Sequence, residues 1–504
     1  MIAPSLHPAP IHAVFQPRSR WAFGLTLRSI TLLLIGFAGL LPGFWDQRLA
    51  YSMLAWDSLV LLFALLDGLR LPAPRHLTAT RTWSNAPALD SETEIELTLV
   101  NQGRLILDCR LVDDLPPALD AHPAPQRLVA FPRVPASLRY MVEPQERGDW
   151  STGGLFLRYR SGLGLVERWA QAPLAQSVRI YPALRTGEEQ QIFLARSRQI
   201  DLQLRQARLR GVGRDFESLR DYRQGDDLRD ICWTATARRG GLITRQYQTE
   251  RSQPVWIVLD CGRLMRARVA ASPSTRRSAA SSHSSSHDFS RAETTATWAG
   301  AFDRERMLAR NSSEPRTHSK LDYAATTAVA LAQLALYSGD RVGLLAYGQG
   351  IQQRLLPGRG AAHLRLLIEA LSQVRAEAGE ADHLRATATL NRLQPRRSLI
   401  LWITDLAETA MRPEVIDGAV QLLRRHVLLF VAMAQPEVES IALARPNSID
   451  QMFRAAAAQE MAARRDLLLA RLHEHGALTL DLNPEALTSS VLNQYLSVKE
   501  RAVV

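Results

Sequence analysis

Two aspartates directly follow apolar runs that are expected to be strands of a parallel sheet. Asp260 follows the continuous apolar run of residues 255–259, and Asp405 follows the run of residues 399–404. In open α/β sheets, ligands bind beyond the carboxyl ends of the strands, so we expect both carboxylates at one edge of the sheet. Carboxylate oxygens suit Mg²⁺, which takes six oxygens in a near-octahedral array. The two residues are therefore candidate magnesium ligands or recognition residues. The alternative is that Asp260 caps its strand and pairs with an arginine.

A second candidate site is the charged and aromatic stretch of residues 211–245. Arginines and aspartates alternate along it, and Phe216, Tyr222 and Trp233 are interleaved with them. Guanidinium groups form planar bidentate pairs with carboxylates, and aromatic rings need a surface to pack on. We interpret the stretch as an ordered arginine–aspartate collar fixed to the domain that follows. The alternative is a solvated connector whose charges balance one another.

The collar also carries a family resemblance. It resembles the signature of a bacterial membrane-protein family, domain of unknown function 58, which contains a von Willebrand factor A-like domain. The residues that match the signature are Arg220, Tyr222, Gly225, Asp226, Asp227, Arg229 and Trp233. The resemblance implies a doubly wound, mostly parallel α/β sheet for the C-terminal part of the chain. It also implies a partner class, the MoxR-type AAA+ ATPases, which are thought to assemble or activate other complexes.

The resemblance also bears on a metal at the strand ends. The von Willebrand A metal site uses Asp-x-Ser-x-Ser after the first strand, a distant threonine and a later aspartate. Here Gly262 and Leu264 replace the two serines that would follow Asp260, while Asp405 keeps the later acidic position and Asp382 falls near the place of the threonine. Two carboxylates alone hold a hydrated Mg²⁺ weakly. We expect a degenerate adhesion site, with Asp260 and Asp405 as its remaining metal ligands.

The elements that would position this site follow an α/β rhythm over residues 255–504, after a linker and signature at 184–254. Buried apolar strands alternating with helices imply a mostly parallel sheet covered on both faces. The strands are expected at residues 255–259, 342–347, 399–404, 427–433 and 478–482, and the helices at 321–337, 361–371, 413–425, 449–474 and 484–495. A serine-rich insertion at residues 266–319 is expected to be disordered, because it has too little apolar surface to bury.

Residues 76–183 have a different pattern. Polar and apolar residues alternate over 93–100, which is typical of a half-buried strand, and several short strands follow between Pro- and Gly-containing turns. This spacing predicts a small antiparallel β-sandwich-like domain. It shows no catalytic cluster, so we interpret it as a spacer or docking module.

Two apolar segments near the N-terminus predict a transmembrane hairpin within residues 21–71. The segments cover residues 21–44 and 49–69, and about 20 mostly apolar residues cross a bilayer core. Asp57 in the second segment is expected to face the other helix. Arginines flank the outer ends of both segments, among them Arg70, Arg75 and Arg81 after the second. The positive-inside rule then places the N-terminal tail, residues 1–20, and everything after the hairpin in the cytoplasm of a bacterium, at its inner membrane.

Composition limits the function classes. The chain has 504 residues, 46% of them apolar, which gives ample cores for several domains. Its three cysteines are scattered, which argues against a disulfide scaffold or a zinc site. No phosphate-binding loop, nucleophile elbow or metalloprotease motif occurs in a suitable context, so we expect no enzyme. We expect a membrane-tethered interaction module that binds a MoxR-type ATPase and other membrane or cytoplasmic proteins. The alternative is binding of nucleic acid or anionic lipid through the charge of +11, almost all of it arginine, and a weaker alternative is magnesium-dependent adhesion.

Overall fold

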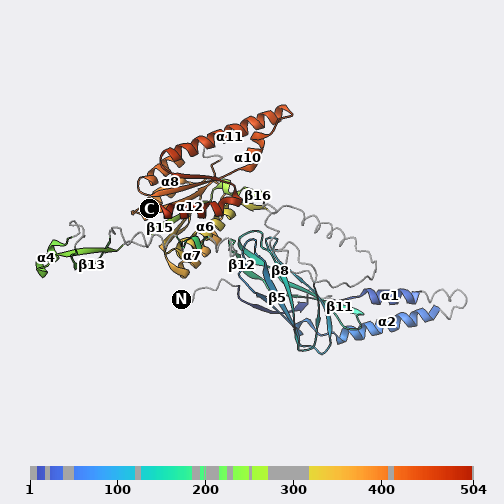
Figure 1. Ribbon diagram of the computed structural model, residues 1–504. Coiled ribbons are helices and arrows are strands. Elements are labelled where there is room, and N and C mark those ends of the chain that lie inside the picture. The colour runs from blue at the N-terminus through green and yellow to red at the C-terminus, as the bar shows by residue number, and fades with distance from the viewer. Residues whose placement is uncertain are drawn as a thin grey trace. The chain divides into compact units, whose positions relative to one another are not determined.

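A computed structural model describes the chain in two compact units. The described residues are 8–17, 23–37, 50–119, 126–183, 193, 195–197, 199, 215–223, 231–248, 253–270, 317–406 and 414–501. One unit comprises residues 1–183 and 292–314, and the other comprises residues 184–291 and 315–504. Figure 1 shows the β-rich N-terminal unit in blue to cyan and the α/β C-terminal unit in yellow to red. Each unit has its own buried apolar core.

The N-terminal unit is built from antiparallel sheets that share a core. One sheet has the strand order β1-β4-β5-β8, a second has the order β2-β11-β10-β6-β7 with β3 also paired to β11, and β12 pairs with β9. Inward-facing side chains of both main sheets, such as Leu97 and Leu157, belong to one buried cluster. The antiparallel sheets expected from the alternating pattern are thus confirmed. The strands are β1 (Ile11–Val14), β2 (Gln16–Pro17), β3 (Phe23–Leu25), β4 (Leu77–Trp83), β5 (Thr93–Asn101), β6 (Leu107–Asp113), β7 (Gln126–Ala130), β8 (Pro135–Val142), β9 (Gly148–Thr152), β10 (Leu155–Arg160), β11 (Val166–Ala172) and β12 (Gln176–Ile180).

These sheets begin earlier in the chain than expected. Residues 11–17, which we expected in a cytoplasmic tail, form β1 and β2, which pair with β4 and β11. The physical reason is an alternation of apolar residues: Ile11 and Ala13 pack against the core, and Phe15 is fully buried. These residues therefore belong to the N-terminal sheets, and their location in the cytoplasm stays a prediction.

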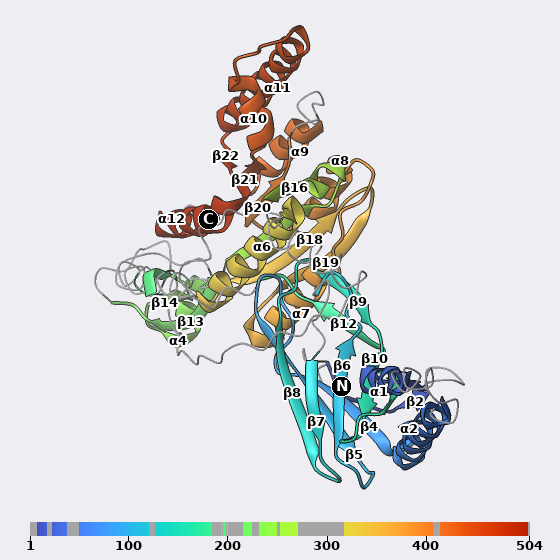
Figure 2. The same cartoon turned by 90° about the vertical axis from the view of Figure 1, so that its right-hand side faces the viewer.

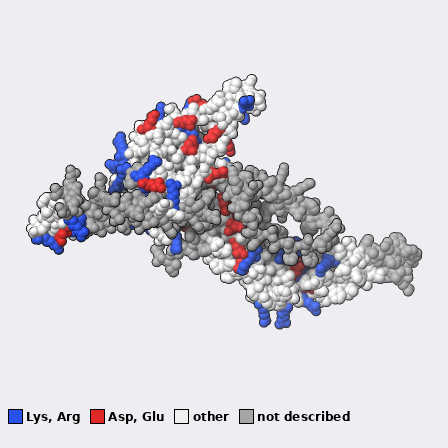
Figure 3. All heavy atoms as spheres, viewed as in Figure 1, with Lys and Arg blue, Asp and Glu red and all other residues white. Residues whose placement is uncertain are grey.

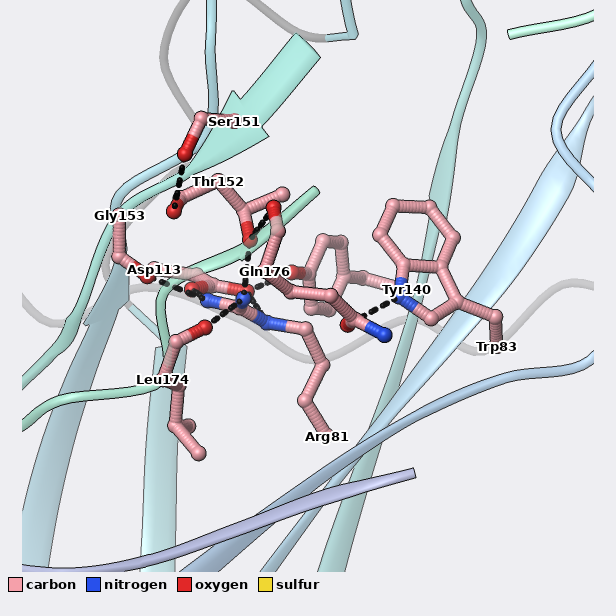
Figure 4. Close-up of polar contacts among 9 residues, drawn as sticks. All are labelled: Arg81, Trp83, Asp113, Tyr140, Ser151, Thr152, Gly153, Leu174 and Gln176. Carbon is pink, nitrogen blue, oxygen red and sulfur yellow. Dashed lines mark hydrogen bonds and ion pairs between the residues drawn. The ribbon is translucent and has the colours of Figure 1, made fainter. Parts of the chain in front are cut away.

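A buried ion pair joins the sheets of this unit. Arg81 on β4 pairs with Asp113 at the end of β6, and both side chains are almost inaccessible to solvent. The guanidinium also donates to Thr152 and to two backbone carbonyls, while Tyr140 donates to Asp113 at 2.5 Å (Figure 4). Arg81 is one of the arginines that follow the second apolar segment in the sequence. In the folded unit its charge lies in the core.

The described residues contain one helix that is long and apolar enough to cross a membrane. It lies within α2 (Ala50–Arg70), over Tyr51–Arg70. The first apolar segment differs from the expected span, because Phe23–Leu25 form β3 and the helix α1 (Leu27–Phe37) has only 11 residues. Residues 38–49 lie outside the described residues, so the second crossing stays a prediction.

The two helices contact each other where Asp57 was expected to face its neighbour. Trp56 on α2 donates its indole N–H to the carbonyl oxygen of Leu32 on α1 at 2.9 Å. A Cβ atom added to Gly36 would come within 2.3 Å of Asp57 Oδ1, so the aspartate does point at α1. Only glycine leaves room for this approach.

The C-terminal unit is a six-stranded sheet with the order β19-β18-β15-β20-β21-β22. All neighbouring strands are parallel except β18 and β19. Counted along the chain from β15, the order is 3-2-1-4-5-6, that of doubly wound folds. The expected mostly parallel α/β sheet is confirmed, with an antiparallel edge strand that we did not expect. The strands are β15 (Pro254–Asp260), β18 (Arg341–Tyr347), β19 (Ile351–Gly358), β20 (Leu399–Thr404), β21 (Val427–Met433) and β22 (Leu478–Leu482).

Helices cover both faces of this sheet (Figure 2). Two of these helices were not expected, α8 (His383–Leu393) and α10 (Pro436–Leu443). The strands and helices that were expected lie within a few residues of their predicted bounds. Side chains from α8, α9 and α11 share one buried cluster with β15, β18, β20 and β21, while α6 packs with α7 and α12. The helices are α6 (Lys320–Tyr337), α7 (Gly360–Gln373), α8 (His383–Leu393), α9 (Glu414–Leu423), α10 (Pro436–Leu443), α11 (Ile449–Glu474) and α12 (Leu487–Glu500).

The ends of the serine-rich insertion are more ordered than we expected. Short strands β16 (Arg268–Ala270) and β17 (Thr317–Ser319) pair antiparallel, which brings the two ends of the insertion together. Ser319 then caps α6 in a capping box with Asp322, and this fixes where α6 begins. Residues 271–316, on which the prediction of disorder falls, lie outside the described residues.

Candidate functional site at the carboxyl ends of the strands

The second predicted carboxylate, Asp405, lies at the end of β20 and is fully buried. Its Oδ2 accepts a hydrogen bond from the Lys320 ammonium at 2.5 Å, and the lysine side chain is 3% exposed. Gln435, which follows β21, donates its amide to both carboxylate oxygens at 3.0 and 3.1 Å. Asp405 is thus held by a buried cation and a half-buried amide. The capping box explains the location of the cation, because it fixes Lys320 as the first residue of α6.

The first predicted carboxylate, Asp260, lies at the end of β15 and is also buried. Its Oδ2 accepts from the Thr404 hydroxyl at 2.6 Å and its Oδ1 accepts from the Gly262 backbone N–H at 2.7 Å. Burial raises the pKa of Asp260 to about 6, and the negative charge of Asp405 adds to the rise, while the two hydrogen bonds oppose it. The structure thus brings the two predicted residues to one edge of the sheet. The alternative partner, an arginine, is replaced by a threonine and a glycine.

The chain after Asp260 runs too close to a neighbouring loop for a serine. A Cβ atom on Gly262 would lie 3.0 Å from the Ala381 nitrogen and 3.1 Å from Asp260 Oδ1. The Arg263 N–H donates to the Gly379 carbonyl at 2.9 Å, which holds the two segments together. Asp382 caps α8 by accepting from the Arg385 N–H at 2.8 Å. Crowding therefore accounts for the glycine at position 262, the first of the two replaced hydroxyl positions, and Asp382 has a capping role.

The residues at this site do not fit a magnesium ion. Both oxygens of Asp260 already accept hydrogen bonds, and Asp405 faces donors from Lys320 and Gln435. The ammonium supplies one positive charge at the point where a metal would bind the carboxylate, and like charges there would repel each other. No group of three or more metal-binding side chains occurs anywhere in the described residues. We conclude that Lys320 takes the place of a cation in this strand-end site.

A buried aromatic layer supports the strand ends from below. The Tyr347 hydroxyl accepts from the Trp402 indole at 2.7 Å and lies 2.9 Å from His383 Nδ1. Burial and the nearby Asp260 charge raise the pKa of Tyr347 well above its usual value, so the ring stays neutral. The neutral, hydrogen-bonded Tyr347 ring therefore makes the surroundings of the site rigid and adds no charge to them.

The residues of the collar fall into described and undescribed groups. Strand β13 (Asp215–Asp221) pairs antiparallel with β14 (Ile243–Gln248), and the short helix α4 (Trp233–Arg239) lies between them. Arg220, Tyr222 and Trp233 are described, and Trp233 is 65% exposed. The remaining signature residues, Gly225, Asp226, Asp227 and Arg229, lie outside the described residues. The proposed arginine–aspartate pairing among them is therefore untested.

Sequence reasoning missed Lys320, Thr404 and Gln435 as members of the strand-end site. One signal was present: Lys320 and Lys499 are the only lysines among 61 basic residues. Both are buried in ion pairs, because Lys499 contacts Asp340 at 3.1 Å with an exposed fraction of 11%. A lysine kept among so many arginines marks a place where a compact point charge fits and a planar guanidinium does not.

The fold and the site together define the C-terminal unit as a doubly wound α/β domain whose ligand edge holds a buried Asp–Lys–Asp cluster. Residues 218–294 and 276–443 match the profile of the family described as "Protein of unknown function DUF58". The chain is therefore similar to this family over residues 218–443, the region in which most of the signature lies.

Two solved structures are similar to parts of the chain. One is titled "conserved hypothetical protein BatB" from Bacteroides thetaiotaomicron, with 11% identity and a TM-score of 0.27, covering 50% of this chain and 100% of that one. The other is a Niemann-Pick type C2 protein from the Japanese carpenter ant, with 9% identity and a TM-score of 0.12, covering 19% and 78%. Neither likeness bears on the function of this chain. The search of curated proteins found no significant match.

Proposed function

We propose that this protein is a membrane-anchored, non-enzymatic interaction module that works with a MoxR-type AAA+ ATPase. In this proposal the ATPase supplies the nucleotide chemistry, and the two proteins together assemble or activate other protein complexes. The C-terminal unit acts as a von Willebrand factor A-like recognition domain, to which its strand order is suited. The partner class comes from the family resemblance of the signature.

The observation that carries the proposal is the exposure of the family signature. Its hairpin presents three large apolar side chains to solvent: Leu219 at 42%, Trp233 at 65% and Leu242 at 46%. Arg238 and Arg239 lie in the last turn of α4, the short helix that begins at Trp233. Tryptophan and arginine are the residues most enriched where binding energy concentrates in protein interfaces. A tryptophan that served only to stabilise the fold would instead be buried, so this surface is suited to a protein partner.

The strand-end site supports recognition rather than catalysis. Its carboxylates, lysine and threonine are paired with one another and buried, so none of these described groups faces solvent as a nucleophile or base. Paired groups of this kind hold the ends of β15 and β20 in one rigid geometry. A rigid edge of a doubly wound sheet is the usual place for a ligand or partner to dock.

The end of α2 supports anchoring at a membrane. Asp67 is 2% exposed and accepts from the Ser161 hydroxyl at 2.5 Å and from the Leu165 N–H at 3.1 Å. Arg168 donates to the Gly68 carbonyl at 3.0 Å. These bonds fix the apolar helix to the β sheets, so a membrane-embedded α2 would hold the N-terminal unit at the bilayer surface. We propose a multi-pass protein of the inner membrane with both soluble units in the cytoplasm.

The test is a quantitative pull-down of the tagged full-length protein from solubilised native membranes. Trp233→Ala is the test variant, and Leu356→Ala is the matched control, because Leu356 is also an exposed apolar residue, at 59%, on edge strand β19. We expect an AAA+ ATPase to be enriched with wild type and with Leu356→Ala, and to be lost with Trp233→Ala. Enrichment of nucleic acid or lipid without an ATPase would overturn the proposal.

That second outcome corresponds to the alternative function. The chain has a net charge of +11, which suits an anionic partner. On the visible face of the C-terminal unit, however, acidic and basic side chains are interspersed and form no basic stripe (Figure 3). Nucleic-acid binding by charge would require such a stripe and would weaken steeply with salt.

A further inference from the structure

Helix α11 carries a second apolar stripe that the fold does not use. Its members recur at alternating steps of three and four residues, the heptad spacing of a helix-pairing seam. They are Ile449, Phe453, Ala456, Glu460, Ala463, Leu467, Ala470 and Glu474, and all of them are exposed. Ile449 is 71% exposed, Phe453 67% and Leu467 55%. Three large apolar residues and three alanines, separated by a glutamate, thus lie in water along one side of α11, and exposed apolar surface of this kind is typical of an interaction site.

The stripe lies on the side of α11 opposite to the buried side. The buried positions are Ala455, Ala458, Arg465, Leu468 and Leu472. At about 100° per residue, the middle of the stripe points roughly 180° away from the middle of that buried set. Figure 2 shows α10 and α11 extending past β22 at the end of the sheet, and every member of the stripe is exposed. No element of the described C-terminal unit therefore occupies the stripe.

We propose that α11 pairs antiparallel with α11 of a second copy of this chain. In the best register, the inner layers of the seam each join a large and a small residue, and Ile449 lies opposite the partner's Glu474 at each end. Phe453 lies opposite the partner's Ala470, and Leu467 lies opposite the partner's Ala456. Large residues then fill the space left by alanines, which allows the two helices to approach closely. Because the arrangement is two-fold symmetric, every such contact occurs twice.

Charge complementarity favours this partner over others. Asp450 flanks one end of the stripe and comes opposite the partner's Arg471 in the same register, again twice. Glu460 and Arg464, which pair within the helix at 2.6 Å, meet their counterparts at the two-fold axis. Glu460 and Glu474 place polar residues within the seam, and such residues fix register and orientation at some cost in stability.

The experiment is cysteine cross-linking of the full-length protein in native membranes with a short bismaleimide. The three natural cysteines are all buried, and burial raises the pKa of the Cys109 thiol to about 12, so introduced thiols are the reporters. Ala463→Cys lies near the two-fold axis and should cross-link to itself. Phe453→Cys lies about 25 Å from its own copy in the antiparallel pair, so it should not. Co-expressed Phe453→Cys and Ala470→Cys chains, carrying different tags, should cross-link to each other.

Ser440→Cys on the adjacent helix α10 is the control for random collision, and should give no dimer band. Phe453→Lys in the Ala463→Cys background should reduce the dimer band at least tenfold, without loss of folded protein because the residue is exposed. Self-cross-linking of Phe453→Cys as efficiently as Ala463→Cys would overturn the antiparallel arrangement. The absence of any Ala463→Cys dimer above the Ser440→Cys control would overturn the pairing itself. Neither result depends on the ATPase partner.

Discussion

Both units of this protein bury an ion pair, and the two pairs differ in whether their charges balance. Arg81 and Asp113 in the N-terminal unit bring one positive and one negative charge, and all three guanidinium nitrogens donate hydrogen bonds. The strand-end site of the C-terminal unit brings together two carboxylates, Asp260 and Asp405, and only Asp405 pairs with an ammonium, that of Lys320.

The difference teaches what each pair does. The balanced pair can only hold sheets together, since it has neither spare charge nor spare acceptor. The unbalanced site keeps a carboxylate whose charged form is disfavoured, and it lies at the sheet edge where doubly wound folds bind ligands. The buried ion pair of the N-terminal unit therefore has a structural role. The ion pair of the C-terminal unit lies at the edge where a ligand would bind in a fold of this kind.

The largest expected effect comes from breaking the balanced pair. Arg81→Met leaves Asp113 buried with only Tyr140 as a donor, together with unpaired acceptors on Thr152 and the backbone. We expect a loss of unfolding free energy of about 3–5 kcal/mol for the N-terminal unit. Pulse proteolysis of the full chain over a urea series measures each unit from its own fragments. A loss under 1 kcal/mol would contradict the assigned role.

Removing the ammonium should have a slightly smaller effect on the other unit. Lys320→Met leaves two buried carboxylates with Gln435 as the remaining donor to Asp405, and we expect a loss of about 3 kcal/mol. The double variant Lys320→Met, Asp405→Leu removes both members of the pair, so it should recover most of that loss. The same proteolysis experiment checks both variants. Equal instability of the single and double variants would show that Lys320 acts by packing alone.

The spare carboxylate should make the stability of the C-terminal unit depend on pH. The pKa of Asp260 is raised to about 6 in the folded unit, above its usual value of 3.8, so the folded state holds the proton more tightly. Unfolding free energy should therefore be highest below about pH 4 and fall by about 3 kcal/mol as pH rises to about 6–7. Asp260→Asn should remove this slope and be the more stable variant at pH 8. Parallel pH profiles for wild type and Asp260→Asn would contradict it.

The smallest expected effect tests whether the strand-end site requires a lysine rather than an arginine at position 320. Lys320→Arg keeps the charge but adds volume and a planar head to a closed site, so we expect a loss of about 1–3 kcal/mol. Arg160→Lys is a suitable comparison, because the side chains of Arg160 and its partner Asp108 are 30% and 36% exposed. Its loss should stay under about 1 kcal/mol. If Lys320→Arg were neutral, the scarcity of lysine would have no bearing on this site.

The sequence predicts the parts of this structure that depend on periodicity. Unbroken apolar runs indicated β15, β20 and β21, and the carboxyl-end rule brought Asp260 and Asp405 together. Edge strand β19 was not predicted, because three polar residues interrupt its apolar pattern: Gln352, Gln353 and Arg354. Pro357 also lies within it, and proline is found at the edge of a sheet, where one side of the strand is unpaired. No local pattern could join Lys320 to Asp405, which are 85 residues apart. Their contact arises from the place where a capping box starts α6.

The most direct test of this account is whether the strand-end site binds a divalent cation. We would titrate Mn²⁺ into the detergent-solubilised full-length protein and count bound ions by electron paramagnetic resonance, for wild type and for Lys320→Ser. Because the ammonium fills the cation position, we predict no bound Mn²⁺ in wild type, and binding in Lys320→Ser that Asp405→Asn abolishes. Stoichiometric Mn²⁺ binding by wild type, lost with Asp260→Asn, would contradict the account and restore the adhesion-type metal site.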